Sequence, residues 1–100
     1  MLAVPASTAV SGMNAAQAGL RTSAHNIANL GTEGFRRQHV VAAEGAHGGV
    51  TTTVNRSDTA GASLETDVVG LLQSKNAFLA NLSVFRTSDR MMGSLLDIAA

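Results

Sequence analysis

The most regular pattern in the chain is an apolar stripe in its C-terminal part. From residue 64 onward, apolar residues recur at alternating steps of four and three, which places them on one face of a helix. Ser63 precedes the stripe as a candidate N-cap, with Glu65 and Asp67 in the favourable first turn. The pattern predicts one long helix over residues 64–98. Its stripe is Leu64, Val68, Leu71, Lys75, Phe78, Leu82, Phe85, Asp89, Met92 and Leu96, widened by Val69, Leu72, Leu79 and Leu95.

Two charged residues interrupt this stripe, and they allow two interpretations. If Lys75 and Asp89 were half-buried, each would penalise misaligned packing and so set the helix register. Alternatively, each side chain reaches solvent or pairs locally, with Asp89 beside Arg86 three residues before it. The second interpretation is favoured, because long charged side chains usually find water.

A weaker helical pattern runs from about residue 8 to Leu30, with Ser7 and Thr8 as candidate N-caps. Gly31 follows where helices commonly end in a left-handed residue. Glycine in a helix interior costs roughly 1 kcal/mol relative to alanine, so this helix is expected to need a partner. Its stripe is Val10, Met13, Gln17, Leu20, Ala24 and Ile27, flanked by small residues that permit close approach of another backbone, namely Gly12, Ala15, Ala16, Ala18 and Gly19.

The segment between the two helical patterns differs in character. Residues 38–44 and 50–55 are rich enough in β-branched residues to pair as strands, and 45–49 would form the turn. Residues 56–62 are typical of a linker. Because an isolated two-stranded hairpin is marginal in water, a flexible connector throughout is the alternative.

Together these patterns predict a mainly α fold. N- and C-terminal amphipathic helices pair as a coiled-coil-like hairpin, with a short loop or small β-hairpin between them. We expect residues 1–35 and 64–100 to form one structural domain, connected by residues 36–63.

The two helices differ in length, at roughly 33 Å and roughly 50 Å. Antiparallel pairing would place Ile27 near Val68 and Val10 near Phe85. The last turns of the longer helix, with Met92, Leu95 and Leu96, would then project past the shorter one unless residues 1–8 extend it. Two helices cannot bury stripes this wide on each other, so exposed apolar surface and self-association or a partner are predicted.

Composition excludes several classes of function. Seven Lys and Arg balance seven Asp and Glu, and charged residues make up only 14% of the chain. No basic stripe for nucleic acid, no polybasic membrane patch and no apolar run for membrane insertion is present. The N-terminus lacks the features of a cleavable signal peptide. With no cysteine, the chain has no disulfide framework.

No constellation of catalytic or ligand-binding residues is visible. His25, His39 and His47 lack partners at metal-ligand spacing. Phosphate-loop and nucleophile motifs are missing from the sequence. Arg36 and Arg37 are expected to form a solvated face. We therefore predict a protein that is not an enzyme, with no catalytic, cofactor or metal site and no small-molecule substrate.

Residues 11–38 and the C-terminal pattern together resemble the flagellar basal-body rod and hook (axial) protein family. In the N-terminal block the resemblance lies in the NIAN and TxGF patterns, with Asn26, Ile27, Ala28, Asn29, Thr32, Gly34 and Phe35 at the family positions. In the C-terminal block it lies in Phe78 with Asn81, and in a methionine followed by Leu95 and Leu96. Only 28 residues, 36–63, separate the two blocks, which is fewer than is usual even for the smallest rod proteins. The chain as a whole therefore resembles a short proximal rod protein.

The resemblance implies a structural subunit whose terminal helices self-assemble into the axial tube. Such subunits are exported unfolded by the flagellar type III apparatus without a cleaved signal, and they act in motility at the periplasm-spanning rod of the basal body. Copies of itself and other rod or hook proteins would be the partners. The residues expected to carry assembly are Asn26, Ile27, Asn29, Thr32, Gly34, Phe35, Leu71, Phe78, Asn81, Leu82, Phe85, Met92 and Leu96. The alternative is a soluble helical-hairpin adaptor or export-associated binding protein that does not polymerise.

Overall fold

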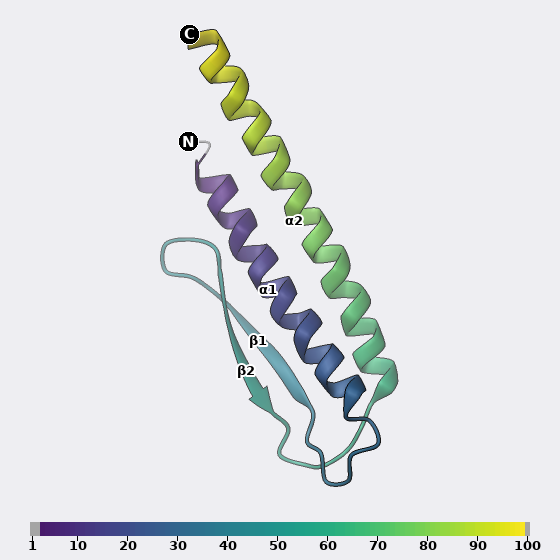
Figure 1. The fold of residues 1–100 in the computed structure, drawn as a ribbon. Helices are drawn as coiled ribbons and strands as arrows, with labels where there is room; N and C mark the ends of the chain where they lie inside the picture. The colour runs from purple at the N-terminus through teal and green to yellow at the C-terminus, as the bar shows by residue number, and fades with distance from the viewer. Residues whose placement is uncertain (1–2, 100) are drawn as a thin grey trace.

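The computed structural model describes residues 3–99 and contains two helices and one β-hairpin. Helix α1 spans Ala3–Ala28, strands β1 and β2 span Gln38–Glu44 and Val50–Arg56, and helix α2 spans Leu64–Ala99. Figure 1 shows α1 between α2 on one side and the hairpin on the other. The molecule measures 62 × 25 × 14 Å, so it is long and thin. The predicted mainly α fold with a small hairpin between long terminal helices is confirmed.

Helix α1 begins earlier than the sequence predicted. It starts at Ala3, so Ser7 and Thr8 are interior residues of the helix and not its N-caps. Pro5 lies within the first turn, where the backbone amides have no intrahelical acceptor and the missing N–H therefore costs nothing.

The end of α1 also differs from the prediction. The helix stops at Ala28, and Gly31 does not adopt a left-handed conformation. Gly34 does, with φ of 73°. The glycine that adopts a left-handed conformation is therefore not Gly31, as predicted, but Gly34, immediately before Phe35.

Small and polar side chains form the closest part of the contact between α1 and α2, and large apolar side chains beside them are half-buried. A Cβ atom at Gly12 or Gly19 would overlap the side chain of Asn81 or Ser74, and one at Gly70 would lie 3.0 Å from Ser23 Oγ. These contacts place the helices antiparallel and very close together. The buried residues are Ala9, Ala16, Ala18, Thr22, Ser23 and Asn26 of α1 and Asp67 and Ser88 of α2.

The predicted stripes therefore lie only partly within this contact, because several of their residues are half-buried and the others are exposed. In α1, Val10, Gln17 and Ala24 are exposed. The residue directly before each of them is buried instead, namely Ala9, Ala16 and Ser23. In α2, Lys75 and Asp89 are both exposed, which agrees with the solvent interpretation. The one ion pair among the described residues involves neither of them.

Helix α2 extends beyond the N-terminal end of α1, as Figure 1 shows. The projecting turns keep their apolar side chains in solvent, and Ile98 is 82% exposed. The early start of α1 does not cover them. The exposed apolar residues there are Met91, Met92, Leu95, Leu96 and Ile98.

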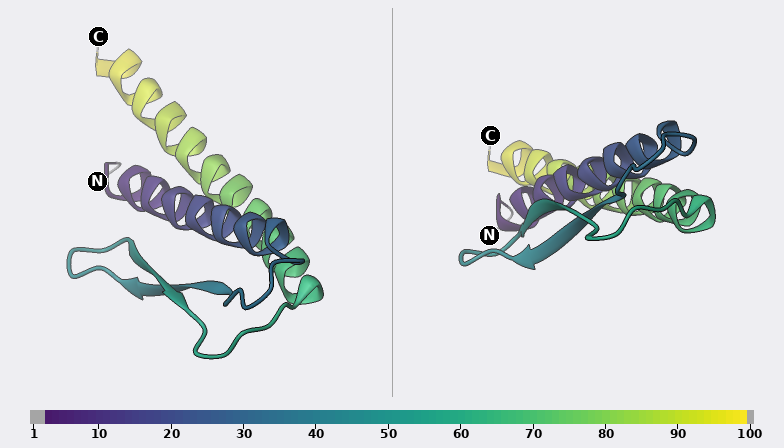
Figure 2. Two further views of the ribbon diagram at one scale, coloured as in Figure 1. Left: turned by 60° about the horizontal axis from the view of Figure 1, so that its bottom comes forward. Right: turned by 90° about the horizontal axis from the view of Figure 1, so that it is seen from below.

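The hairpin matches the predicted strands to within one residue. It is antiparallel, with Gln38 opposite Arg56 and Glu44 opposite Val50. Both strands pack against α1, and the two further views separate the hairpin from most of α2 (Figure 2). Because every residue of β2 is exposed, the hairpin adds little to the core.

Candidate assembly site

Asn26 is the centre of a polar cluster that joins α1, β1 and α2. Its side chain is 3% exposed although it belongs to the last turns of α1. Its Nδ2 donates to the Gln38 carbonyl at 2.8 Å, and its Oδ1 accepts from the Gln38 amide at 2.8 Å. Asn26 thus bonds the first residue of β1 as a neighbouring strand would. Nδ2 also donates to Asp67 Oδ1 at 3.1 Å.

Asp67 connects the first turn of α2 to the segment that leads into β1. Arg37 Nε donates to Asp67 Oδ2 at 3.2 Å, and Arg37 Nη2 donates to Asp67 Oδ1. These bonds lower the pKa of Asp67 below its ordinary value of 3.8, against the opposing effect of burial, and the Asn26 amide lowers it further. The same contact raises the pKa of Arg37. The carboxylate is therefore ionised and fully bonded at neutral pH.

The turn after α1 is held by the predicted motif residues. Asn29 Nδ2 donates to the His25 carbonyl at 2.8 Å, and Thr32 Oγ1 donates to Asn29 Oδ1 at 3.3 Å. The Phe35 ring meets the His25 ring edge-on, with centroids 5.4 Å apart. The Phe35 carbonyl accepts from the Gly61 amide at 3.1 Å, so the turn also fixes the start of the connection into α2.

A second pair of hydrogen bonds joins the N-terminal half of α1 to the hairpin. Ser11 Oγ accepts from the Val50 amide at 2.5 Å and donates to the Val50 carbonyl at 2.8 Å. Gly49 adopts a φ of 78°, and a Cβ atom there would lie 2.9 Å from Ser11 Oγ. Ser11 and Asn26 therefore hold the hairpin at two points along α1.

The assembly residues predicted on α2 do not share one environment. Leu71, Phe78, Leu82 and Phe85 are half-buried, whereas Met92 and Leu96 are exposed. Asn81 is half-buried, donates to the Ala77 carbonyl at 2.8 Å and faces Gly12. Ile27 of α1 is half-buried. Only the N-terminal motif residues gather at one place, the end of α1.

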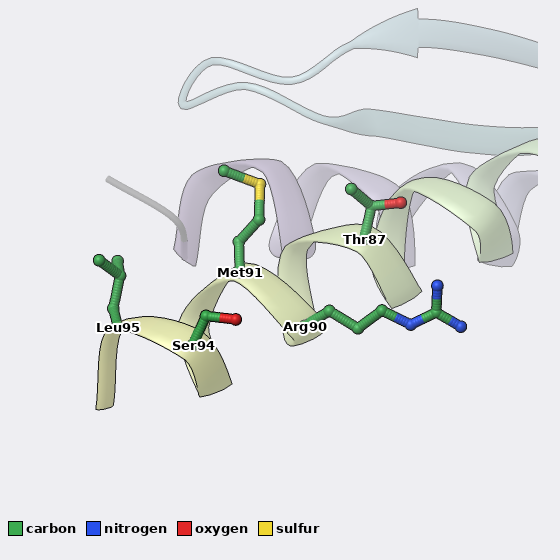
Figure 3. A pocket seen from close by; sticks show the side chains of 5 residues that line it. All are labelled: Thr87, Arg90, Met91, Ser94 and Leu95. Carbon is green, nitrogen blue, oxygen red and sulfur yellow. The ribbon is translucent and has the colours of Figure 1, made fainter. Parts of the chain in front are cut away.

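Large apolar side chains are exposed along the whole length of α2 and, given 3.6 residues per turn, on more than one side of it. We group them under the name α2 face: Leu64, Val68, Val69, Leu72, Leu79, Val84, Met91, Met92, Leu95, Leu96 and Ile98. Leu72 and Leu79 are 54% and 50% exposed. Toward the C-terminal end, Met91 and Leu95 line a hollow with Thr87, Arg90 and Ser94 (Figure 3). This face can bind another apolar surface, and its side chains offer no catalytic chemistry.

The described part of the chain holds no cluster of three or more His, Asp or Glu side chains that could hold a metal ion. Neither α1 nor α2, within the residues described, is long and apolar enough to cross a bilayer. The geometry at Asn26 is a structural junction between three elements.

Sequence reasoning missed three residues of this junction. Arg37 was expected in a solvated face, yet it pairs with Asp67. Asp67 was expected only to favour the helix N-terminus, and Ser11 was given no role. The sequence does place Asp67 in the first turn of α2. That this position faces Asn26 can be recognised only once the alignment of α2 against α1 is known.

Comparison with models of known protein families gives a match in the N-terminal part of the chain. Residues 7–36 match a family model described as flagella basal body rod protein. The matched segment contains most of α1, the turn after it and the motif residues from Asn26 to Phe35. No curated protein matched the chain. The match confirms the resemblance inferred from the N-terminal block and supports a flagellar rod family.

Proposed function

We propose, taking the rod-family match of residues 7–36 as the premise, that this protein is a structural subunit of the flagellar basal-body rod. In this proposal, copies of the chain self-assemble through α1 and α2 into the axial tube, beside other rod or hook proteins. The chain would reach the rod through the flagellar type III export apparatus. The activity is assembly, and it needs no cofactor or substrate.

The observation that carries the proposal is the exposure of the α2 face. Transfer of apolar surface out of water contributes roughly 25 cal/mol per Å², so a helix with this many exposed aliphatic side chains gains free energy by packing against neighbours. The α1–α2 contact is closest at small and polar residues and leaves the side chains of the α2 face exposed. A monomer therefore leaves most of its hydrophobic stabilisation unrealised until it assembles.

The same arrangement suits export as an unfolded chain. A two-helix pair in which the described residues include no large, fully buried side chain has a small free energy of unfolding. Folding coupled to assembly would allow the chain to pass through a narrow channel and become stable only in the rod.

The proposal is tested by isolating basal bodies from cells in which the chain carries Leu72→Asp and Leu79→Asp together. Both side chains are exposed in the monomer, so the substitutions leave its fold intact but place charges in the assembly contact. We expect the variant to be absent from purified rods and the cells to lose motility.

The matched control is Asn76→Asp, which adds the same side chain at an exposed polar position of α2. It should be incorporated normally. Rods that contain the double variant at the wild-type level, or that lack the wild-type chain itself, would contradict the proposed function.

A further inference from the structure

The strands of the hairpin leave part of each outer edge without hydrogen-bond partners. In an antiparallel ladder, residues that bond the partner strand alternate with residues whose N–H and C=O point outward. The Gly45 amide donates to the Gly49 carbonyl at 2.9 Å, and the Ser57 amide donates to the Arg37 carbonyl at 2.8 Å. Given the strand register, odd-numbered residues bond inward and even-numbered residues point outward.

Among the described residues, side chains of α1 form hydrogen bonds with the first outward-pointing residue of each strand and with no other. Asn26 bonds Gln38 on the edge of β1, and Ser11 bonds Val50 on the edge of β2. The helix therefore crosses the hairpin diagonally. In Figure 1, β1 is outermost near the connecting loop and β2 is outermost at its C-terminal end.

Two short free edges remain, at opposite ends of the hairpin. One is residues 42–44 of β1 and the other is residues 54–56 of β2. Neither has the lysine, proline or bulge that commonly protects an exposed edge. A free edge of this kind accepts one type of partner, an extended strand.

The charges of the two free edges are complementary. Glu44 is the only acidic residue of β1, and Arg56 is the only basic residue of β2. Within one chain they lie at opposite ends of the hairpin, because Glu44 faces Val50 and Arg56 faces Gln38. They are therefore about 20 Å apart.

We propose that the hairpins of successive copies pair edge to edge, with residues 42–44 of one copy antiparallel to residues 54–56 of the next. Ala42 then lies opposite Arg56, Ala43 opposite Asn55 and Glu44 opposite Val54, so that Glu44 and Arg56 become diagonal neighbours within reach of each other. The contact joins two different edges, so it propagates in one direction and does not close into a dimer. The inference rests on the proposed rod function, to which it adds a second contact besides the α2 face.

The first test uses thiols, because the natural chain has no cysteine. In the proposed ladder, residues 43 and 55 form a non-hydrogen-bonded pair with Cα atoms about 4.5 Å apart, a separation that a disulfide spans. Ala43→Cys and Asn55→Cys chains are mixed under assembly conditions and oxidised. We expect A43C–N55C heterodimers to form in excess over either homodimer.

Homodimers of N55C would instead show a closed β2–β2 contact and overturn the proposal. A heterodimer yield no higher than that of N55C with Asn76→Cys, which reports random collision on exposed α2, would overturn it too. Sedimentation of the same samples distinguishes failure of the edge contact from failure of the proposed rod function. If polymers form without the heterodimer, only the edge contact is contradicted. If the chains stay monomeric, the proposed rod function is contradicted as well.

The second test reverses the charges. Glu44→Arg or Arg56→Glu alone should lower the polymerised fraction several-fold, because each places like charges together across the contact. The double variant E44R/R56E should recover most of the loss. Because the two residues do not meet within one chain, the circular dichroism of the monomer should stay unchanged in all three variants. Failure of the double variant to exceed the single variants would contradict the pairing.

Discussion

At the scale of single residues, the fold depends on the polar junction around Asn26. An asparagine side chain both donates and accepts, so it can replace a strand at the edge of β1 while also binding Asp67. Arg37 completes the junction by neutralising the buried carboxylate. A sequence motif that looked like a helix end is in fact the point where α1, β1 and α2 are held together.

Asp67→Asn should destabilise the folded chain by about 2 kcal/mol at neutral pH, because it removes the charge partner of Arg37. The native pKa of Asp67 lies below its unfolded value of 3.8, so its contribution is complete above that pH and is lost as pH falls through the native pKa. Denaturant unfolding at pH 7 and below pH 3.8 measures this. A difference between D67N and wild type that does not shrink in acid would contradict the assignment.

At the scale of the elements, α1 and α2 approach closely because glycine, alanine and serine line their contact. This close contact could not be predicted from the sequence, because the large apolar residues next to the small ones gave the stronger helical pattern. Hydrophobic periodicity locates the apolar face of a helix, but it does not say whether that face meets the partner helix or remains outside. The hairpin was predictable from its β-branched runs, whereas its attachment through Ser11 and Asn26 depends on contacts between segments far apart in sequence.

Gly19→Leu should destabilise the helix pair by roughly 2 kcal/mol, since its side chain would overlap Ser74 and force the helices apart. The matched control is Gly93→Leu in α2, where a Cβ atom meets nothing within 4 Å. That substitution should be neutral or slightly stabilising, because leucine has the higher helix propensity. Equal thermal midpoints for the two variants would show that the close contact at Gly19 is unimportant for stability.

At the scale of the whole molecule, the chain is thin and three-layered and leaves many of its large apolar side chains exposed. Its buried residues are small or polar, and many of the large aliphatic side chains of α2 are exposed. The predicted lengths of the two helices indicated that α2 would extend beyond α1. In the structure it does, and the projecting turns carry exposed apolar side chains. The structure thus strengthens the expectation that the monomer is an incomplete unit, which was inferred first from the width of the stripes.

The central claim is that this exposed surface is completed by other copies of the chain. Sedimentation velocity of the purified protein across a wide concentration range, with far-UV circular dichroism of the same samples, tests it most directly. We predict a marginally stable, partly helical monomer at low concentration and large species with increased helicity at high concentration. A fully helical monomer or dimer that is independent of concentration would contradict the account.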